Sequence, residues 1–178
     1  MATCSSETRR KMVVDVIRSA FERRLRPNRI YWGYSRDPDE SKSQEYFESL
    51  RSEEEILAAE SDFLDSLIWL ESDAFLYFIP IFMIGSTKNS CGTGKVHEFV
   101  VEFLSGGIDN SDDISSWSSN PTRFFSQMSV EELDSVEKWL FPVVEGSDLS
   151  GTCPIDDEKY SCRKALEFYK IRQEIERL

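Results

Sequence analysis

The segment CGTGK, from Cys91 to Lys95, contains the glycines and the lysine of a phosphate-binding loop. A complete loop also has a glycine five positions before Gly94 and a serine or threonine directly after the lysine. This chain has Asn89 and Val96 there, so the residues for the tight turn and the magnesium ligand are missing. We therefore do not expect a nucleotide or another cofactor at this segment.

Residues 109–113, with the sequence DNSDD, place side-chain oxygens at alternate positions, as a calcium-binding loop does. Such a loop needs glycine at its sharp turn and a bidentate glutamate at its end. Those two positions hold Ile114 and Asn120. We interpret the segment as a solvated acidic loop that binds no metal.

His97 is the only histidine, so any catalytic triad would have to use it. A structural zinc ion takes four ligands. The spacing between His97 and the four cysteines, Cys4, Cys91, Cys153 and Cys162, matches no zinc-binding motif. No nucleophile motif accompanies this histidine. The sequence predicts no catalytic residue, no metal site and reduced thiols. We expect His97 at the surface, near the start of a helix.

Glu71 and Asp73 are the last pair of residues whose side chains could take part in a reaction. Two carboxylates at this spacing can act as a general acid and a general base. They also lie just before an apolar segment, where carboxylates complement the positive N-terminal end of a helix dipole. We favour the structural role, because no other polar group in the sequence converges on them.

Most of the apolar residues recur at helical spacing, so the elements that position these candidate residues should be helices. Serine and glutamate three positions apart form capping boxes at Ser52–Glu55 and Ser129–Glu132. We expect a mainly α fold, a compact bundle of about five to six helices with little or no sheet. The predicted helices are 7–25, 52–68 (or from near 43), 72–85, 96–104, 129–140 and 156–177. The whole chain, 1–178, should be one domain, with loops near 27–44, 85–94, 105–128 and 145–155.

The same periodicity predicts which side chains face the core. In the first helix Phe21 and Leu25 share the apolar face, and Ile175 lies on the apolar face of the last helix. Phe47 lies in a more polar stretch, so we expect its truncation to cost much less stability than truncation of Phe78 or a neighbouring core ring.

Residues 73–85 form the centre of the predicted bundle. Apolar side chains cover two adjacent faces of a helix here, and a helix that is apolar all round is buried all round. Pro80 cannot donate to the carbonyl of Leu76, which predicts a kink or a break. A buried strand is the alternative, because short apolar runs fit both structures. The uncharged part is far shorter than the roughly 20 residues of a membrane span, so we expect no membrane insertion.

The segment Glu60–Ile84, ESDFLDSLIWLESDAFLYFIPIFMI, resembles a family of uncharacterised small acidic bacterial proteins. In that family a tryptophan-containing helix leads into an aromatic run of the form A-F-x-Y-x-x-P. The matching residues of this chain are Trp69, Ala74, Phe75, Tyr77 and Pro80. Residues 17–21 and 124–140 are similar as well. The resemblance implies a shared fold and assigns no activity to any residue.

Charge is distributed unevenly along this acidic chain, whose net charge is −12. Residues 1–36 contain nine Lys or Arg and three Asp or Glu, a balance of +6, so the remainder carries −18. Residues 37–73 alone contribute −11, from thirteen acids and two bases. Such asymmetry indicates that the two segments pack together, that the charge serves solubility alone, or that a partner of opposite charge binds. A net negative field disfavours nucleic acid.

We carry two hypotheses for function. The first is a non-catalytic, cytoplasmic interaction module that binds a basic protein, by analogy with immunity proteins and inhibitors of basic toxins. Its candidate contact residues are Glu53, Glu54, Asp62 and Asp65. The second is a small-molecule-binding protein or enzyme whose site is assembled from scattered residues, which no motif would reveal.

Overall fold

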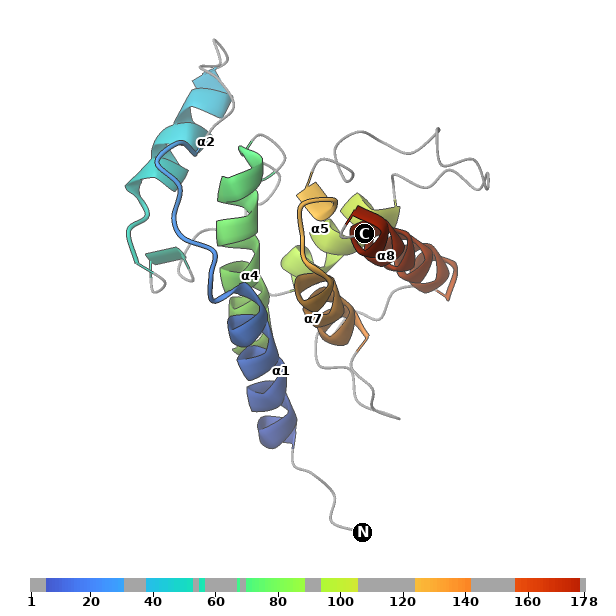
Figure 1. Cartoon of the computed structure of the whole chain (residues 1–178). Helices are drawn as coiled ribbons and strands as arrows, with labels where there is room; N and C mark the ends of the chain where they lie inside the picture. Colours follow the sequence, from blue (N-terminus) through green and yellow to red (C-terminus); the bar gives the residue numbers. More distant parts are fainter. Residues whose placement is uncertain are drawn as a thin grey trace.

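The computed structural model describes residues 6–30, 38–52, 55–56, 67, 70–88, 94–105, 124–141 and 156–176. Within these ranges the chain forms six helices and no strand, which confirms the predicted mainly α fold (Figure 1). The helices are α1 (Ser6–Phe21), α2 (Pro38–Ser49), α4 (Ser72–Lys88), α5 (Gly94–Ser105), α7 (Val130–Leu140) and α8 (Asp156–Glu176).

Helix α4 is the central element of the bundle, as its apolar sequence predicts. It contacts α1 and α5, and Figure 1 shows it between α2 on one side and α5, α7 and α8 on the other. Phe78 packs edge-on against Phe47 of α2, with ring centroids 5.2 Å apart. On another face Phe75 stacks on Phe124 at 4.1 Å. Rings on several faces of one helix bury large areas and so join elements from distant parts of the sequence.

Pro80 lies inside α4, and the helix continues past it as one element to Lys88. The alternatives of a break and of a buried strand are therefore both wrong. Helix α4 also extends into the loop predicted near 85–94, because its polar C-terminal residues are satisfied within the helix. The hydroxyls of Ser86 and Thr87 both donate to the carbonyl of Met83, at 2.8 and 2.9 Å.

The loop predicted near 27–44 is shorter than expected, because α2 begins at Pro38. Proline suits the first position of a helix, since its fixed φ is already helical and its missing N–H would have no partner there. Phe47 of α2 is fully buried, which corrects the expectation of a peripheral ring. Its contacts with Phe78 and with Phe82, at 6.4 Å, place it in the core.

Two helix ends also differ from expectation. Helix α1 ends at Phe21, and Leu25 is 82% exposed instead of facing the core. The amide of Arg24 donates to the carbonyl of Phe21 at 2.9 Å, so the chain turns here. In α8, Ile175 is 64% exposed although its spacing predicted an inward position. Helical periodicity places a side chain on a face but cannot say how far along that face the neighbouring helices reach.

The predicted loop 105–128 ends in ordered, buried structure. Phe124, Phe125 and Met128 are buried, and the amides of Gln127 and Met128 donate to the carbonyls of Phe124 and Phe125. These residues lead directly into α7. The predicted loop 145–155 lies outside the described residues, as does most of the predicted helix 52–68.

Candidate functional site

The four candidate partner-binding residues, Glu53, Glu54, Asp62 and Asp65, all lie outside the described residues. So do the potential calcium loop 109–113 and residues 91–93 of the potential phosphate loop. The other two residues of the potential phosphate loop, Gly94 and Lys95, are the first two residues of α5. The structure therefore brings none of these predicted residues together in a site.

The capping box next to the acidic candidates is present. The Glu55 amide donates to the hydroxyl of Ser52 at 3.1 Å, and the Glu55 carboxylate accepts from the amides of Arg51 and Ser52. These two backbone hydrogen bonds lower the pKa of Glu55. The Ser52–Glu55 capping box therefore fixes the backbone at residues 51–52 and at Glu55.

Two arginines that follow α1 join the basic N-terminal segment to the acidic segment 37–73. Arg26 donates to the carbonyls of Phe47 and Glu48, both at 3.3 Å, and to that of Leu50. Its guanidinium also lies over the ring of Phe78, 5.6 Å from the centroid. A cation at the C-terminal end of a helix satisfies carbonyls that have no partner within the helix. Arg26 therefore caps α2.

Arg29 makes the second connection to the acidic segment. Its guanidinium lies 3.3 Å from the carboxylate of Glu71, whose amide donates to the carbonyl of Ile30 at 2.9 Å. These two contacts connect Glu71 to the segment that follows α1, and they differ from the predicted complement to the helix dipole. Asp73 is an exposed residue in the first turn of α4, where its charge suits the helix dipole.

A paired arginine and glutamate connect the end of α1 to the start of α7. Arg24 donates from Nε to Glu132 Oε1 at 2.6 Å and from Nη2 to Glu132 Oε2 at 2.8 Å. Arg24 also donates to the carbonyl of Gln127 at 2.7 Å. The hydrogen bond to Glu132 raises the pKa of Arg24 despite the opposing effect of burial. Bidentate pairs of this kind are strong and directional.

The partner carboxylate is also part of the second capping box. Glu132 Oε2 accepts from the amide of Ser129 at 2.7 Å, while the Glu132 amide donates to the Ser129 hydroxyl at 3.2 Å. The capping box predicted at the start of this helix is confirmed. Arg24 and the backbone thus use three of the about four acceptor sites of the Glu132 carboxylate, so we assign this carboxylate to the fold.

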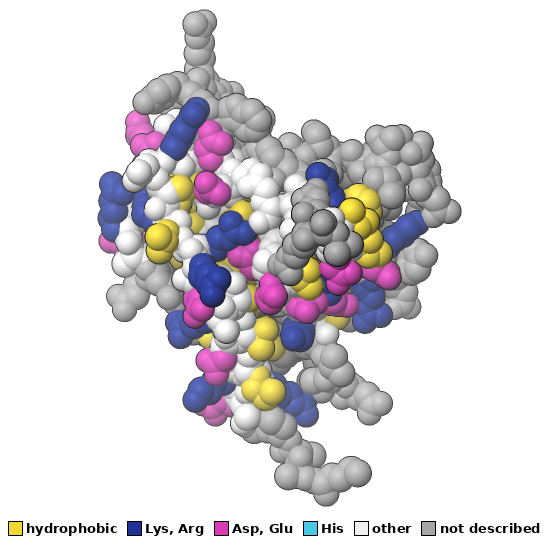
Figure 2. All heavy atoms as spheres, in the orientation of Figure 1, with side chains coloured by type: hydrophobic (Ala, Val, Ile, Leu, Met, Phe, Trp, Pro, Cys, Tyr) yellow, Lys and Arg dark blue, Asp and Glu magenta, His cyan; other side chains and the backbone are white. Residues whose placement is uncertain are grey.

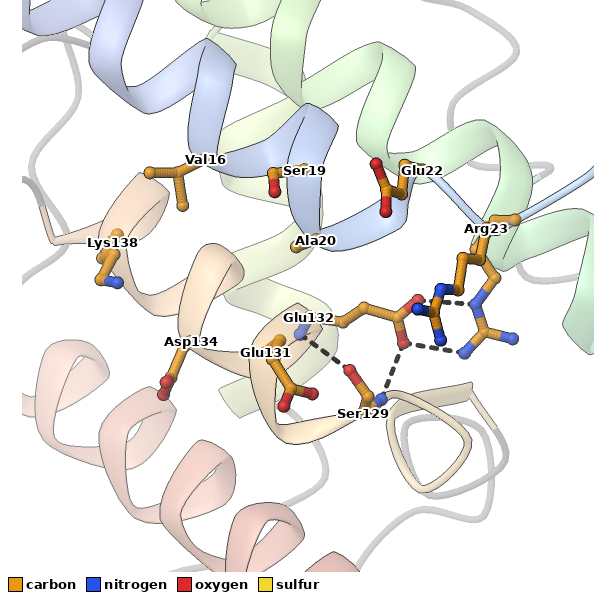
Figure 3. A pocket seen from close by; sticks show the side chains of 11 residues that line it. Val16, Ser19, Ala20, Glu22, Arg23, Ser129, Glu131, Glu132, Asp134 and Lys138 are labelled. Carbon is orange, nitrogen blue, oxygen red and sulfur yellow. Dashed lines mark hydrogen bonds and ion pairs between the residues drawn. The ribbon is translucent and has the colours of Figure 1, made fainter.

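A groove of about 810 Å³ opens beside this pair, between α1 and α7 (Figure 3). Val16, Ser19 and Ala20 line it from α1, and Glu131, Asp134 and Lys138 line it from α7. Its volume lies in the range of about 300–1,000 Å³ that is usual for small-molecule sites. No sequence motif marks this groove, because its two walls come from segments more than one hundred residues apart.

The charged side chains at the rim of the groove differ in whether another residue of the protein already binds them. Asp134 is held by Lys170 of α8, whose Nζ lies 2.5 Å from Asp134 Oδ1 and 2.6 Å from Glu137 Oε2. No hydrogen bond or ion pair joins Arg23 or Lys138 to another described residue. Figure 3 shows these two cations on opposite sides of the groove. Both can therefore turn toward an anionic ligand.

His97 is buried, with 2% of its surface exposed, which corrects the expectation of a surface histidine. It does lie in the first turn of a helix, α5. Its ring packs on the indole of Trp139, with centroids 5.3 Å apart, and that indole N–H donates to the hydroxyl of Ser86 at 3.1 Å. These contacts join α4, α5 and α7, so we assign His97 to the core.

Metal-ligating residues form no cluster in the described part of the chain. Cys162, the one cysteine there, is a buried free thiol near the carbonyl of Val101. None of the described helices is long and apolar enough to cross a membrane. Figure 2 shows acidic and basic side chains interspersed over the described part of one face, without a uniformly acidic surface.

Comparison with protein-family models, with curated proteins and with solved structures found no match to this chain. The family resemblance of residues 60–84 and its neighbouring segments therefore stays a prediction.

Proposed function

We propose that this chain is a non-catalytic interaction module that binds a basic protein, in the manner of an immunity protein or an inhibitor of a basic toxin. The observation that carries the proposal is that arginines of the basic segment are used within the molecule while an excess of acidic residues remains. Arg24, Arg26 and Arg29 of the basic segment make hydrogen bonds or ion pairs with other residues of the same chain. Glu132 pairs with Arg24 and Glu71 with Arg29, but the −18 of residues 37–178 exceeds the +6 of residues 1–36, so a net charge of −12 remains even if every base of the basic segment is paired.

The proposed contact residues are Glu53, Glu54, Asp62 and Asp65. An excess of one charge raises the rate of encounter with an oppositely charged protein, and salt reduces this effect over a Debye length of roughly 8 Å at physiological ionic strength. We place the protein in the cytoplasm of a bacterium, which fractionation of its host would test.

Neutralisation of these acids tests the proposal. The test variant combines Glu53→Gln, Glu54→Gln, Asp62→Asn and Asp65→Asn, which changes the net charge from −12 to −8 by one unit for each carboxylate. The control variant, Asp15→Lys with Glu102→Lys, reaches the same −8 by two reversals at exposed helical positions. Both variants and the wild type are used as bait in a quantitative pull-down from extract of the native host.

We expect the wild type and the control to retain the same basic protein, and the test variant to lose it. The association rate of the purified pair should fall at least tenfold between 50 and 300 mM salt for the wild type. A specific partner that is acidic, or that all three baits retain equally at both salt concentrations, contradicts the proposal.

The α1/α7 groove supports a second candidate function, binding of a small anionic molecule between Arg23 and Lys138. Citrate and inorganic phosphate are suitable probes, because both are compact anions that two cations can hold. We expect millimolar citrate to raise the melting temperature and to shift amide resonances of Ser19 and Ala20. Arg23→Ala with Lys138→Ala should abolish both effects, whereas Arg18→Ala, an exposed arginine of α1 outside the groove, should not. No response in the wild type would remove this candidate.

A further inference from the structure

Helix α8 has a second apolar strip that the bundle covers only in part. Its core face consists of Cys162, Ala165, Leu166 and Tyr169, all buried against α5 and α7. Away from that face, Ile171 is 50% exposed and Ile175 is 64% exposed, and Phe168 beside them is partly buried with part of its ring against the core. We call Phe168, Ile171 and Ile175 the outer strip. Figure 1 shows α8 at the edge of the described bundle, with α7 and α5 on its inner side.

The spacing of the outer strip is that of a helix-pairing seam. Phe168, Ile171 and Ile175 are separated by three and then four residues, as alternate a and d positions of a heptad are. Leu178 continues the same spacing in the sequence, beyond the described residues. A strip this narrow fits one helix lying along α8, because side chains facing a broad core would occupy a wider arc.

Charges flank the outer strip asymmetrically. With Phe168 and Ile175 at a positions, Glu167 and Glu174 occupy g positions on one flank, and Arg172 occupies an e position on the other. In a parallel helix pair, each g residue faces the e residue five positions further along the partner. Glu167 and Arg172 are five positions apart, so two parallel copies of α8 bring opposite charges together twice. An antiparallel pair would instead place the glutamates of the two g flanks opposite one another.

We propose that two copies of this chain associate through the outer strip of α8, with the two helices parallel and Glu167 of each copy facing Arg172 of the other. The strip is self-complementary in charge, as a two-fold symmetric interface requires. A basic partner would find an attractive glutamate flank but a repulsive Arg172, so the strip fits a second copy better than such a partner.

The interface is small, and this determines the strength of the dimer. Stable interfaces bury about 1,200–2,000 Å² in total, more than a strip of three or four apolar side chains on each copy supplies. We therefore expect a reversible dimer, half formed at a protein concentration on the order of 10–100 μM. Sedimentation velocity of the full chain from about 5 to 300 μM covers this range.

Substitution of the strip is the first test. Ile171→Asp with Ile175→Asp should leave a monomer at every concentration, with an unchanged far-ultraviolet circular dichroism spectrum because both positions are exposed. The matched control is Met12→Asp with Leu25→Asp, which changes two exposed apolar residues outside α8, 60% and 82% accessible. The control should dimerise like the wild type. A wild type that is monomeric throughout, or a strip variant that dimerises normally, overturns the proposal.

Charge exchange and cross-linking test the parallel arrangement. Glu167→Arg should weaken the dimer at least threefold, and addition of Arg172→Glu to that variant should restore it. Ile175→Cys, in a chain with Cys4, Cys91 and Cys153 changed to Ser, should cross-link to its own counterpart with a short bifunctional thiol reagent. A dimer that persists without this cross-link, or that Glu167→Arg strengthens, shows that the parallel α8 pair is wrong.

Discussion

At the scale of single residues, arginines connect helices that lie far apart in the sequence. Arg26 is the clearest example, because it binds three carbonyls at the C-terminal end of α2 while its guanidinium covers Phe78 of α4. Hydrogen bonds from a charged donor contribute about 1.5–3 kcal/mol each when the alternative is an unsatisfied acceptor. The carbonyl of Glu48 is near solvent, so water can replace part of this contribution.

We predict that Arg26→Ala lowers the free energy of unfolding by about 2–3 kcal/mol, measured by urea denaturation. Arg26→Lys should recover less than half of this loss, because an ammonium group keeps the charge but cannot bind several carbonyls and stack on a ring at once. Arg23→Ala is the control, with an expected change below about 0.5 kcal/mol for a surface position without a partner among the described residues. Equal effects of Arg26→Ala and Arg23→Ala would show that the cap contributes nothing.

At the scale of elements, the interface between α2 and α4 depends on Phe47 as much as on Phe78. Both rings are fully buried and lie edge-to-face. We predict that Phe47→Ala and Phe78→Ala each cost about 3–5 kcal/mol, the usual range for a buried ring replaced by a cavity. The two losses together should exceed that of the double variant by about 0.5–1.5 kcal/mol, the extra stabilisation of an aromatic pair. A loss below about 1 kcal/mol for Phe47→Ala would place α2 outside the core.

The interface between α7 and α8 should depend on alkaline pH through Lys170. Burial opposes its charge, but hydrogen bonds to Asp134 and Glu137 outweigh this and raise the pKa of Lys170 above its usual value of 10.5. A folded-state pKa above the unfolded value contributes stability that is fully present below the unfolded pKa. This contribution is lost as the pH rises through the folded pKa.

We therefore predict that the stability of the wild type falls more steeply above pH 10 than that of Lys170→Met, in urea denaturation at pH 8 to 12. Lys138→Met removes an exposed lysine of α7 and should retain the steep fall. A wild type and a Lys170→Met variant with parallel profiles would show that Lys170 has the same pKa in both states.

At the scale of the whole molecule, helices from both ends of the chain share one core with α4. Helix α1 contacts α4 and α7, and α8 contacts α5 and α7, so no described helix group buries its apolar face independently. We predict a single unfolding transition, with the same midpoint by far-ultraviolet circular dichroism and by tryptophan fluorescence. A chelator or a reductant should not shift this midpoint, because the sequence has no zinc-ligand set and the described thiol is free. Two separated transitions, or a shift on addition of either reagent, would contradict the prediction.

The sequence by itself determined the helical fold, the central apolar helix and both capping boxes. These features depend on residues three or four positions apart, or on one continuous run such as residues 73–85, so local geometry is sufficient to predict them. Net charge and its division at residue 36 are likewise properties of the sequence alone. Helix ends were less predictable, since Phe21 ends α1 where the chain turns to bring Arg24 and Arg26 to other helices.

Only the tertiary structure decided which polar residues are buried and where a groove lies. His97 belongs to the core because Trp139 and Ser86, which are 53 positions apart in the sequence, come together beside it. The α1/α7 groove and the Arg24–Glu132 pair likewise join segments that no periodicity relates. The exposure of Ile171 and Ile175 in the outer strip of α8 is likewise a result of packing, because their residue types alone would suit a core. Burial is a property of the packed assembly, because the same apolar face can meet either a neighbouring helix or solvent.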